Sequence, residues 1–362
     1  MDTRTERLDV LVLGDGPAAV SAALHVKRRA GDAAVALWRS APVGAGDVPP
    51  RPGVALAAPS PDLVAAHATR GDARLAGEIA LARAGLDSLE REVRAAGIAC
   101  GFRRERVARD PVPDEPGRAR ATEELERRFA PADDAVFDPT ALLAGLTDAA
   151  RAAGVDVRAT GGAPALDAAD DAVDVAAGRL RARATRVVLA AEAALVRFDP
   201  WVRSLALPAR IEALALAADD AFAAFPPRSL GPGFAVAAPD ASGRLLVAEG
   251  IEPSNRGDPL DPAPNERAQA RLEEWAASIV PTPRRGAPAK VVARGAHAAL
   301  YTCDGLPLVG PHPGRAACLL AAGFGGREET DGWLAGAAVA EIVVDGRTST
   351  EGAALWSPRR ML

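Results

Sequence analysis

The stretch LDVLVLGDGPAA at residues 8–19 joins an apolar run directly to a glycine-rich turn. An apolar run without period-2 alternation is typical of a central strand in a parallel sheet. Gly14 permits a tight turn, Gly16 lets a ligand phosphate approach the main chain, and Ala19 lets helix and strand pack closely. Pro17 suits the first turn of the Ala-rich helix that follows. The stretch therefore predicts a dinucleotide site, with a pyrophosphate at the amino end of the helix; an ordinary strand-to-helix turn is the alternative.

Length and composition set the class of protein. The chain has 362 residues, is 49% apolar and carries a net charge of −5, which suggests about two domains and no nucleic-acid or anionic-membrane partner. The cysteines Cys100, Cys303 and Cys318 lie far apart and without metal-ligand spacing, so we expect no disulfide framework and no metal site. The polar start runs straight into a strand, and no apolar run is long enough to span a bilayer. We expect a cytoplasmic protein.

The end of the second predicted strand, residues 33–38, departs from the usual dinucleotide pattern. An acidic residue there normally accepts the ribose hydroxyls. This chain has Trp38-Arg39 instead. Trp38 could stack on adenine and Arg39 could meet a phosphate; alternatively, the acidic contact has been lost.

Further along, the pattern predicts a mixture of helices and short strands. Asp138 is a plausible N-cap and Gly154 a plausible C-terminal residue of one helix. Helices are expected over 62–96 (two), 122–129, 138–153, 266–280 and 331–344. Strands are expected over 155–159, 173–176, 180–183, 185–191, 209–217, 234–238, 244–249, 290–300 and 317–322.

This order of elements predicts an α/β fold in two parts. A Rossmann-like, mostly parallel sheet would be built from residues 1–61, 138–200 and 300–362. The inserts, residues 62–137 and 201–299, would form a second, mainly antiparallel α+β domain that holds the substrate.

Several segments, in order, resemble the D-amino-acid oxidase / sarcosine oxidase superfamily of FAD-dependent oxidoreductases. They are GDGPAAVSAALHV, FDPTALLAGLTDAARAAGVDV, RVVLAAEA, TCDGLPLVGP, AAGFGG with LAGAAVAEIVVDG, and the closing LWSPRRML. The resemblance covers nearly the whole chain. It implies an enzyme that oxidises a C–N bond of a small amine or amino acid to an imine by hydride transfer to FAD.

The chain departs from the family pattern at several positions. Trp38 replaces the ribose-binding acid, Glu192 replaces a glycine after RVVLAA, and Arg327-Glu328 replaces a His-Gly pair. The family's Ser-Gly-Arg-Asn loop reads DVPPR, ending at Arg51. A carboxylate at Glu192 would repel a cofactor phosphate. These departures raise a second hypothesis: a degenerate member that binds FAD weakly or not at all and serves as a partner subunit or a non-redox biosynthetic protein.

Two more departures concern substrate and cofactor. The arginine that often clamps a substrate carboxylate falls at Ala299, which favours a substrate other than a simple α-amino acid. The cysteine that tethers flavin in the sarcosine oxidase branch also falls at an alanine, so the resemblance implies non-covalent FAD. A partner subunit or a homo-oligomer remains open.

Three residues are candidates for catalysis. Arg327 could supply positive charge near the flavin, or could pair with Glu328 or Glu329 at a helix start. Tyr301 could line the pocket or be a core tyrosine. His297 could act as a base or substrate ligand, or lie at the rim. The predicted cofactor-binding residues are Gly14, Gly16, Pro17, Ala18, Ala19, Trp38, Arg39, Arg51, Ala163, Ala191, Gly323, Gly325 and Gly326.

Overall fold

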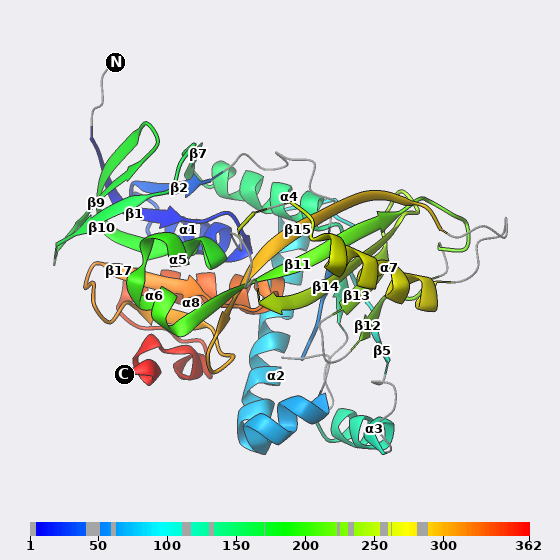
Figure 1. Cartoon of the computed structure of the whole chain (residues 1–362). Helices are drawn as coiled ribbons and strands as arrows, with labels where there is room; N and C mark the ends of the chain where they lie inside the picture. The colour runs from blue at the N-terminus through cyan, green and yellow to red at the C-terminus, as the bar shows by residue number, and fades with distance from the viewer. Residues whose placement is uncertain are drawn as a thin grey trace.

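The computed structural model describes residues 5–40, 51–58, 63–110, 117–129, 134–169, 171–222, 225–230, 235–253, 260–261, 263–280 and 289–362. The residues of the DVPPR loop before Arg51 lie outside this part. A mostly parallel sheet and a mostly antiparallel sheet organise the described residues, and they lie side by side in Figure 1.

The first sheet contains eight strands in the order β16-β17-β10-β1-β2-β7, with β9 beside β10 and β8 beside β9. The strands are β1 (Glu6–Leu13), β2 (Val35–Arg39), β7 (Asp156–Ala159), β8 (Ala165–Ala168), β9 (Val173–Ala177), β10 (Leu180–Leu189), β16 (Leu308–Pro311) and β17 (Cys318–Ala322). β17, β10, β1, β2 and β7 run parallel, whereas the other pairings are antiparallel. The central β1 is buried on both faces, which explains its continuous apolar run.

Helices cover both faces of this sheet. On one face lie α1 (Pro17–Arg29), α4 (Pro139–Ala152) and α8 (Trp333–Asp345). α1 and α8 are in close contact, because a Cβ added at Gly336 would lie 2.4 Å from the carbonyl oxygen of Ala18. The other face carries a second apolar cluster under the short helices α5 (Leu195–Phe198) and α6 (Pro200–Leu205). This double covering is the layer architecture of a doubly wound fold.

The second sheet has the order β15-β11-β14-β13-β12-β5. Its strands are β5 (Ala108–Asp110), β11 (Ala206–Leu216), β12 (Arg228–Leu230), β13 (Ala235–Pro239), β14 (Leu245–Pro253) and β15 (Val291–Thr302). All its pairings are antiparallel except β12 with β5. Helix α7 (Glu266–Ile279) packs on one face through Leu272, against Leu214 and Val247. The opposite face is turned towards the candidate site.

The long helix α2 (Leu63–Ala95) packs against α8. Gly71 inside it has φ 71°, which breaks it into two helices as the sequence predicts. A Cβ added at Gly85 would lie 2.5 Å from the carbonyl oxygen of Thr330, so α2 packs tightly on a π-helical turn, Glu328–Gly332, that precedes α8. The remaining elements are α3 (Arg118–Phe129), the three-stranded sheet of β3 (Val54–Ala55), β6 (Ala135–Val136) and β4 (Arg103–Arg104), and the 3-10 turns Glu192–Ala194, Ala353–Trp356 and Pro358–Met361.

The predicted α/β class is confirmed, with local differences. Asp138 caps α4 by accepting from the amides of Thr140 and Ala141. Residues 180–191 were expected as two strands but form the single strand β10, because Ala184 continues the pairing with both β1 and β9. β16 lies in the Gly- and Pro-rich segment 302–314, whose composition favours a loop. Its pairing with β17 explains the strand, since tertiary contacts override weak local propensity. The domain boundaries remain a prediction.

Within the described ranges, none of the helices combines the length and apolar character that crossing a membrane requires.

Candidate functional site

The turn after β1 has the close main-chain packing that a bound phosphate requires. Gly14 has φ +157°, and a Cβ there would lie 2.1 Å from the carbonyl oxygen of Ala190. The amide of Gly14 donates to the carbonyl of Trp38 at 3.1 Å. α1 starts at Pro17, and Gly16 at its N-cap gives no side-chain cap. The amides and the positive end of α1 therefore favour an anion supplied from elsewhere.

A carboxylate of the chain itself lies at this turn. A Cβ added at Gly16 would lie 2.8 Å from Oε2 of Glu328 and 3.6 Å from its carboxyl carbon. Glu328 opens the π-helical turn, which is held between α2 and α1; in the latter contact, Gly332 faces Ala18. The carboxylate thus stands on rigid main chain, beside the amino end of α1 where a pyrophosphate is expected.

Further acids surround Glu328. The pKa of Glu328 is raised. Burial is the main cause, the charges of Glu329 and Asp15 add to it, and the charge of Arg51 opposes it. Burial, and then the charge of Glu328, raise the pKa of Glu192 well above its usual range. Arg51 faces these carboxylates from outside the turn: it forms an ion pair with Glu329 and approaches Glu328 at 3.9 Å. Burial and mutual repulsion therefore favour the protonated forms of Glu328 and Glu192.

Glu192 occupies a backbone conformation made for glycine. Its φ of 44° is positive, and among the described non-glycine residues it is alone in this. Its Oε1 accepts a hydrogen bond from the amide of Gly323 at 2.9 Å, while its buried Oε2 has no hydrogen-bond partner among the described residues. The side chain therefore reaches from the end of β10 to the end of β17, across the carboxyl edge of the sheet where ligands of such folds bind.

The arrangement can be compared with what FAD binding requires. The main chain of the turn fits a pyrophosphate. The side chains do not fit one in their present positions, because the Glu328 carboxylate lies beside Gly16 and Glu192 bonds to Gly323. A carboxylate and a pyrophosphate cannot share the amino end of one helix without strong repulsion in a buried place. FAD would therefore have to displace Glu328.

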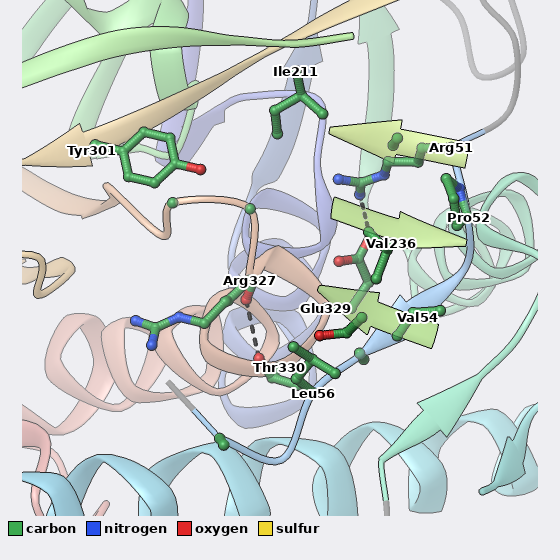
Figure 2. Close-up of a pocket in the computed structure, with 16 residues that line it drawn as sticks. Arg51, Pro52, Val54, Leu56, Ile211, Val236, Tyr301, Arg327, Glu329 and Thr330 are labelled. Atoms are coloured by element: carbon green, nitrogen blue, oxygen red, sulfur yellow. Dashed lines mark hydrogen bonds and ion pairs between the residues drawn. The ribbon is translucent and has the colours of Figure 1, made fainter. Parts of the chain in front are cut away.

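A small cavity lies beside the turn, between the antiparallel sheet and the glycine loop. Its volume is about 90 Å³. Figure 2 shows Tyr301 and Arg51 pointing into this space from opposite sides, beneath Ile211. The sheet contributes one face, because Val236 pairs with Ala248 in the register and both line the cavity. The full lining is Arg51, Pro52, Val54, Ala55, Leu56, Ala58, Ile211, Ser229, Val236, Ala248, Tyr301, Gly325, Gly326, Arg327, Glu329 and Thr330.

Two buried polar atoms on this face lack partners among the described residues. They are Oγ of Ser229, which is 1% exposed, and Nε2 of His297. Ser229 lines the cavity, and His297 pairs in the register with Ile211, which lines it too. A buried polar atom without a partner is unfavourable by about 1–3 kcal/mol, so a ligand that bonds to it gains accordingly. The cavity is built to receive a polar ligand.

The candidate catalytic residues have defined protonation states. Burial, followed by the charge of Arg51, lowers the pKa of His297 to about 4, so its imidazole is neutral near pH 7 and only a weak proton acceptor. Burial raises the pKa of Tyr301 to about 12, although Arg327 opposes this, so its hydroxyl stays protonated. The Tyr301 ring lies flat on the glycine loop, because a Cβ at Gly325 would touch it at 3.0 Å.

Arg327 and Arg51 both line the cavity, but their charges are already paired. Arg327 binds Asp331 at 2.8 Å, one helical turn on, rather than Glu328 or Glu329. In Figure 2 its guanidinium points away from Arg51. Burial opposes a charged Arg51, yet Glu329 and Glu328 raise its pKa. The sequence placed Arg51 among the cofactor ligands; the structure places it in the cavity wall.

Some of the other predicted cofactor residues lie at the glycine turn and the glycine loop, and the rest do not. Ala191 precedes Glu192 at the end of β10, and Glu192 bonds to Gly323 of the glycine loop, which also holds Gly325 and Gly326. Trp38, 1% exposed, packs in the apolar cluster on the sheet face opposite α1, and no face of it is open to stack on a base. Arg39 is also buried, 3.9 Å from Asp15. Ala163 is exposed after the end of β7.

Some residues escaped the sequence analysis. The cavity residues Ser229, Val236 and Ala248 come from short strands without a motif, and only their pairing brings them together. Glu329 was considered as a partner of Arg327, but it pairs with Arg51. Cys303 is exposed, whereas Cys100 and Cys318 are buried. No cluster of metal-binding side chains occurs in the part of the chain that the structure describes.

Comparisons with known proteins give the family and the fold. The family model described as FAD dependent oxidoreductase matches residues 9–344. The chain is similar to glycine oxidase from Geobacillus kaustophilus, with 20% identity, a TM-score of 0.76 and 98% of each chain covered. It is similar to iminodiacetate oxidase from Chelativorans sp. BNC1, with 17% identity, a TM-score of 0.74, and 96% and 98% covered. It is also similar to L-proline dehydrogenase from P. horikoshii, with 14% identity and a TM-score of 0.71; the match covers 99% of this chain and 98% of that one.

Among curated proteins, no sequence matches the chain significantly. The identities to the solved structures are low, and they support the shared fold alone.

Proposed function

The chain belongs to the family of FAD-dependent oxidoreductases, and we propose that it oxidises a C–N bond of a small amine or amino acid to an imine. Non-covalent FAD, when bound, would supply the hydride acceptor. The observation that supports this proposal is the cavity between the antiparallel sheet and the glycine loop, which adjoins the cofactor turn and is lined by the unpartnered Oγ of Ser229. Three proteins of similar structure are named as a glycine oxidase, an iminodiacetate oxidase and an L-proline dehydrogenase, and these names favour the same substrate class.

The cavity limits the substrate to a small molecule. Sites for drug-sized ligands measure about 300–1,000 Å³, whereas this cavity is about 90 Å³. Its walls are apolar at Ile211, Val236 and Ala248, so a bound substrate contacts apolar side chains on that side. An amine held there loses its proton more readily than in water, because burial disfavours the charged form.

The polar residues would orient that substrate. The protonated hydroxyl of Tyr301 can donate, and the neutral imidazole of His297 can accept from an amine N–H. Arg51 can bind a substrate carboxylate, which would have to compete with Glu329 for it. The position of the usual carboxylate clamp is Ala299, and Arg51 is one of two arginines, with Arg327, that line this cavity instead.

The test is anaerobic bleaching of flavin. The full chain is incubated with excess FAD, so that weak binding is saturated, and mixed with glycine, sarcosine, iminodiacetate or L-proline. We expect at least one of them to bleach the visible flavin absorbance. Val236→Phe should abolish bleaching by filling the cavity, whereas Val292→Phe, at an exposed position of the same sheet, should not. If none of a broad panel of amines bleaches FAD at demonstrated saturation, the proposal fails.

The acids at the turn favour a second candidate, a member of the family that has lost redox chemistry and serves as a partner subunit or in a non-redox biosynthetic step. Glu328 against Gly16 is the observation behind it. The two candidates differ in one simple property. A ligand that binds the native state raises its stability, so the oxidoreductase should melt at a higher temperature in excess FAD and the second candidate should not. A cytoplasmic setting and an oligomer or partner chain are proposed from the sequence alone.

A further inference from the structure

We propose that Glu328, held by Arg51, is the chain's own occupant of the anion site at the glycine turn, and that FAD binds weakly and reversibly because it must displace this carboxylate. The inference rests on the proposed function only in that FAD is the group displaced. It concerns binding and needs no turnover.

Position is the first argument. The Glu328 carboxylate lies 2.8 Å from where a Cβ on Gly16 would stand, so it fills the space that the missing side chain of Gly16 leaves. That space is what lets a pyrophosphate approach the main chain in this type of turn. The first turn of α1 has no acidic residue and no side-chain cap of its own. Glu328 therefore supplies the negative charge that this helix end favours.

The second argument is that Glu328 is held in place. Its main chain belongs to a π-helical turn packed between α1 and α2, with Gly85 and Gly332 as the close contacts. Its side chain is approached by Arg51, which also pairs with Glu329 and comes from the segment just before β3. Movement of Glu328 thus requires Arg51 to give up part of its pairing, and this couples the turn to the cavity wall.

Charge is the third argument. Asp15, Glu192 and Glu329 contribute to the electrostatics around Glu328, and Arg51 is the cation that opposes them. A pyrophosphate would add negative charge to this group of acids. Where Glu328 is replaced, the repulsion falls and the space at Gly16 opens.

The experiment measures equilibrium binding of FAD and of ADP to the full chain. ADP carries the pyrophosphate without the flavin, so it reports on the turn alone. The variants are Glu328→Gly, which removes charge and volume, and Glu328→Gln, which removes charge and keeps nearly the same shape. Glu351→Gly, an exposed glutamate in a turn, is the control.

We expect Glu328→Gly to bind both nucleotides about tenfold or more tightly than the wild type, Glu328→Gln to lie between, and the control to match the wild type. Equal affinities for all four proteins, or a wild type that purifies with one FAD per chain, would overturn the inference. The Gln variant keeps the test valid if the Gly variant unfolds.

The outcome also separates this inference from the proposed function. Tighter nucleotide binding by the Glu328 variants without amine-dependent bleaching supports the inference and removes the oxidase proposal. If the wild type bleaches with an amine and its nucleotide affinities equal those of the Glu328 variants, the oxidase proposal is supported and the inference is removed.

Discussion

The glycine turn and the cavity lie next to each other and differ in how their polar groups are paired. At the turn, Glu328 and Glu192 crowd a helix end that needs only one anion. Oγ of Ser229, which lines the cavity, and Nε2 of His297, on the strand beside it, are buried polar atoms without a hydrogen-bond partner among the described residues. The first region is occupied by the protein's own groups, while the second awaits a ligand.

This difference separates what a motif specifies from what it does not. The GDGPAA turn dictates main-chain geometry, which depends on the small residues within it. Occupancy depends on side chains that come from β10 and from the turn before α8, far away in the sequence. A chain can therefore keep the form of a cofactor turn while its surroundings change the affinity for the cofactor.

Replacing Gly14 should have the largest effect. A Cβ at Gly14 would lie 2.1 Å from the Ala190 carbonyl oxygen, so Gly14→Ala should lower the free energy of unfolding by about 3 kcal/mol or more. Gly31→Ala, where nothing lies within 4 Å, is the matched control. Denaturant unfolding measures both. A stable Gly14→Ala protein would show that the turn is not tightly packed.

The cavity side of the comparison predicts an acid effect through His297. Its pKa is about 4 in the folded chain against 6.5 ordinarily, so the folded state binds fewer protons between these values. Stability is lost as the pH falls from 6.5 towards 4. We expect this loss to be about 2 kcal/mol smaller in His297→Leu than in the wild type. Unfolding curves at pH 7 and pH 4.5 give the difference, and parallel curves would contradict a buried neutral imidazole.

The turn side predicts the opposite sign through Glu192. Since its folded pKa is raised, the folded state holds the proton longer, and stability falls as the pH rises above the ordinary carboxyl pKa. Glu192→Gln should therefore be more stable than the wild type at pH 8 by about 1 kcal/mol, with the gap closing near pH 4. Glu192→Gly should gain further, because it relieves the φ of 44°. Melting temperatures at both pH values test this; a Gln variant that melts lower at pH 8 would contradict it.

The smallest effect is a pH dependence of FAD affinity. Burial raises the pKa values of Glu328 and Glu192, and protonating these two carboxyls reduces the repulsion of a pyrophosphate. We expect the wild type to bind FAD about two- to fivefold more tightly at pH 6 than at pH 8, and Glu328→Gln to show a flatter profile. Equilibrium dialysis at each pH measures it. A wild-type affinity that is constant or rises with pH would exclude these carboxyls as the cause.

Much of the fold could be predicted because local signals agreed with the final packing. The run from Val10 to Leu13 is apolar throughout and lies in the centre of the sheet, and Asp138 caps the helix that it was expected to cap. β16 could not be predicted, since its residues become a strand only by pairing with β17. Trp38 was expected at a ligand and lies in the core, because its side chain belongs to the sheet face opposite α1.

Less of the site could be predicted. The replacements at Glu192 and Glu328 were visible in the sequence, but their contacts with Gly323 and Gly16 depend on how β17 and α8 pack. Arg51 was placed with the cofactor by resemblance, and its pairing with Glu329 became clear only in three dimensions. Short strands such as β12 and β13 carry the cavity's Ser229 and Val236 without any motif.

The most direct test of the central claim is a crystal structure of the wild-type chain soaked with FAD. We predict the pyrophosphate against the amides of the Gly14–Ala19 turn, with the Glu328 carboxylate swung away from Gly16 and Arg51 repositioned. A structure with Glu328 still beside Gly16 and FAD bound at another place, or FAD at the turn without any movement of Glu328, would contradict the account.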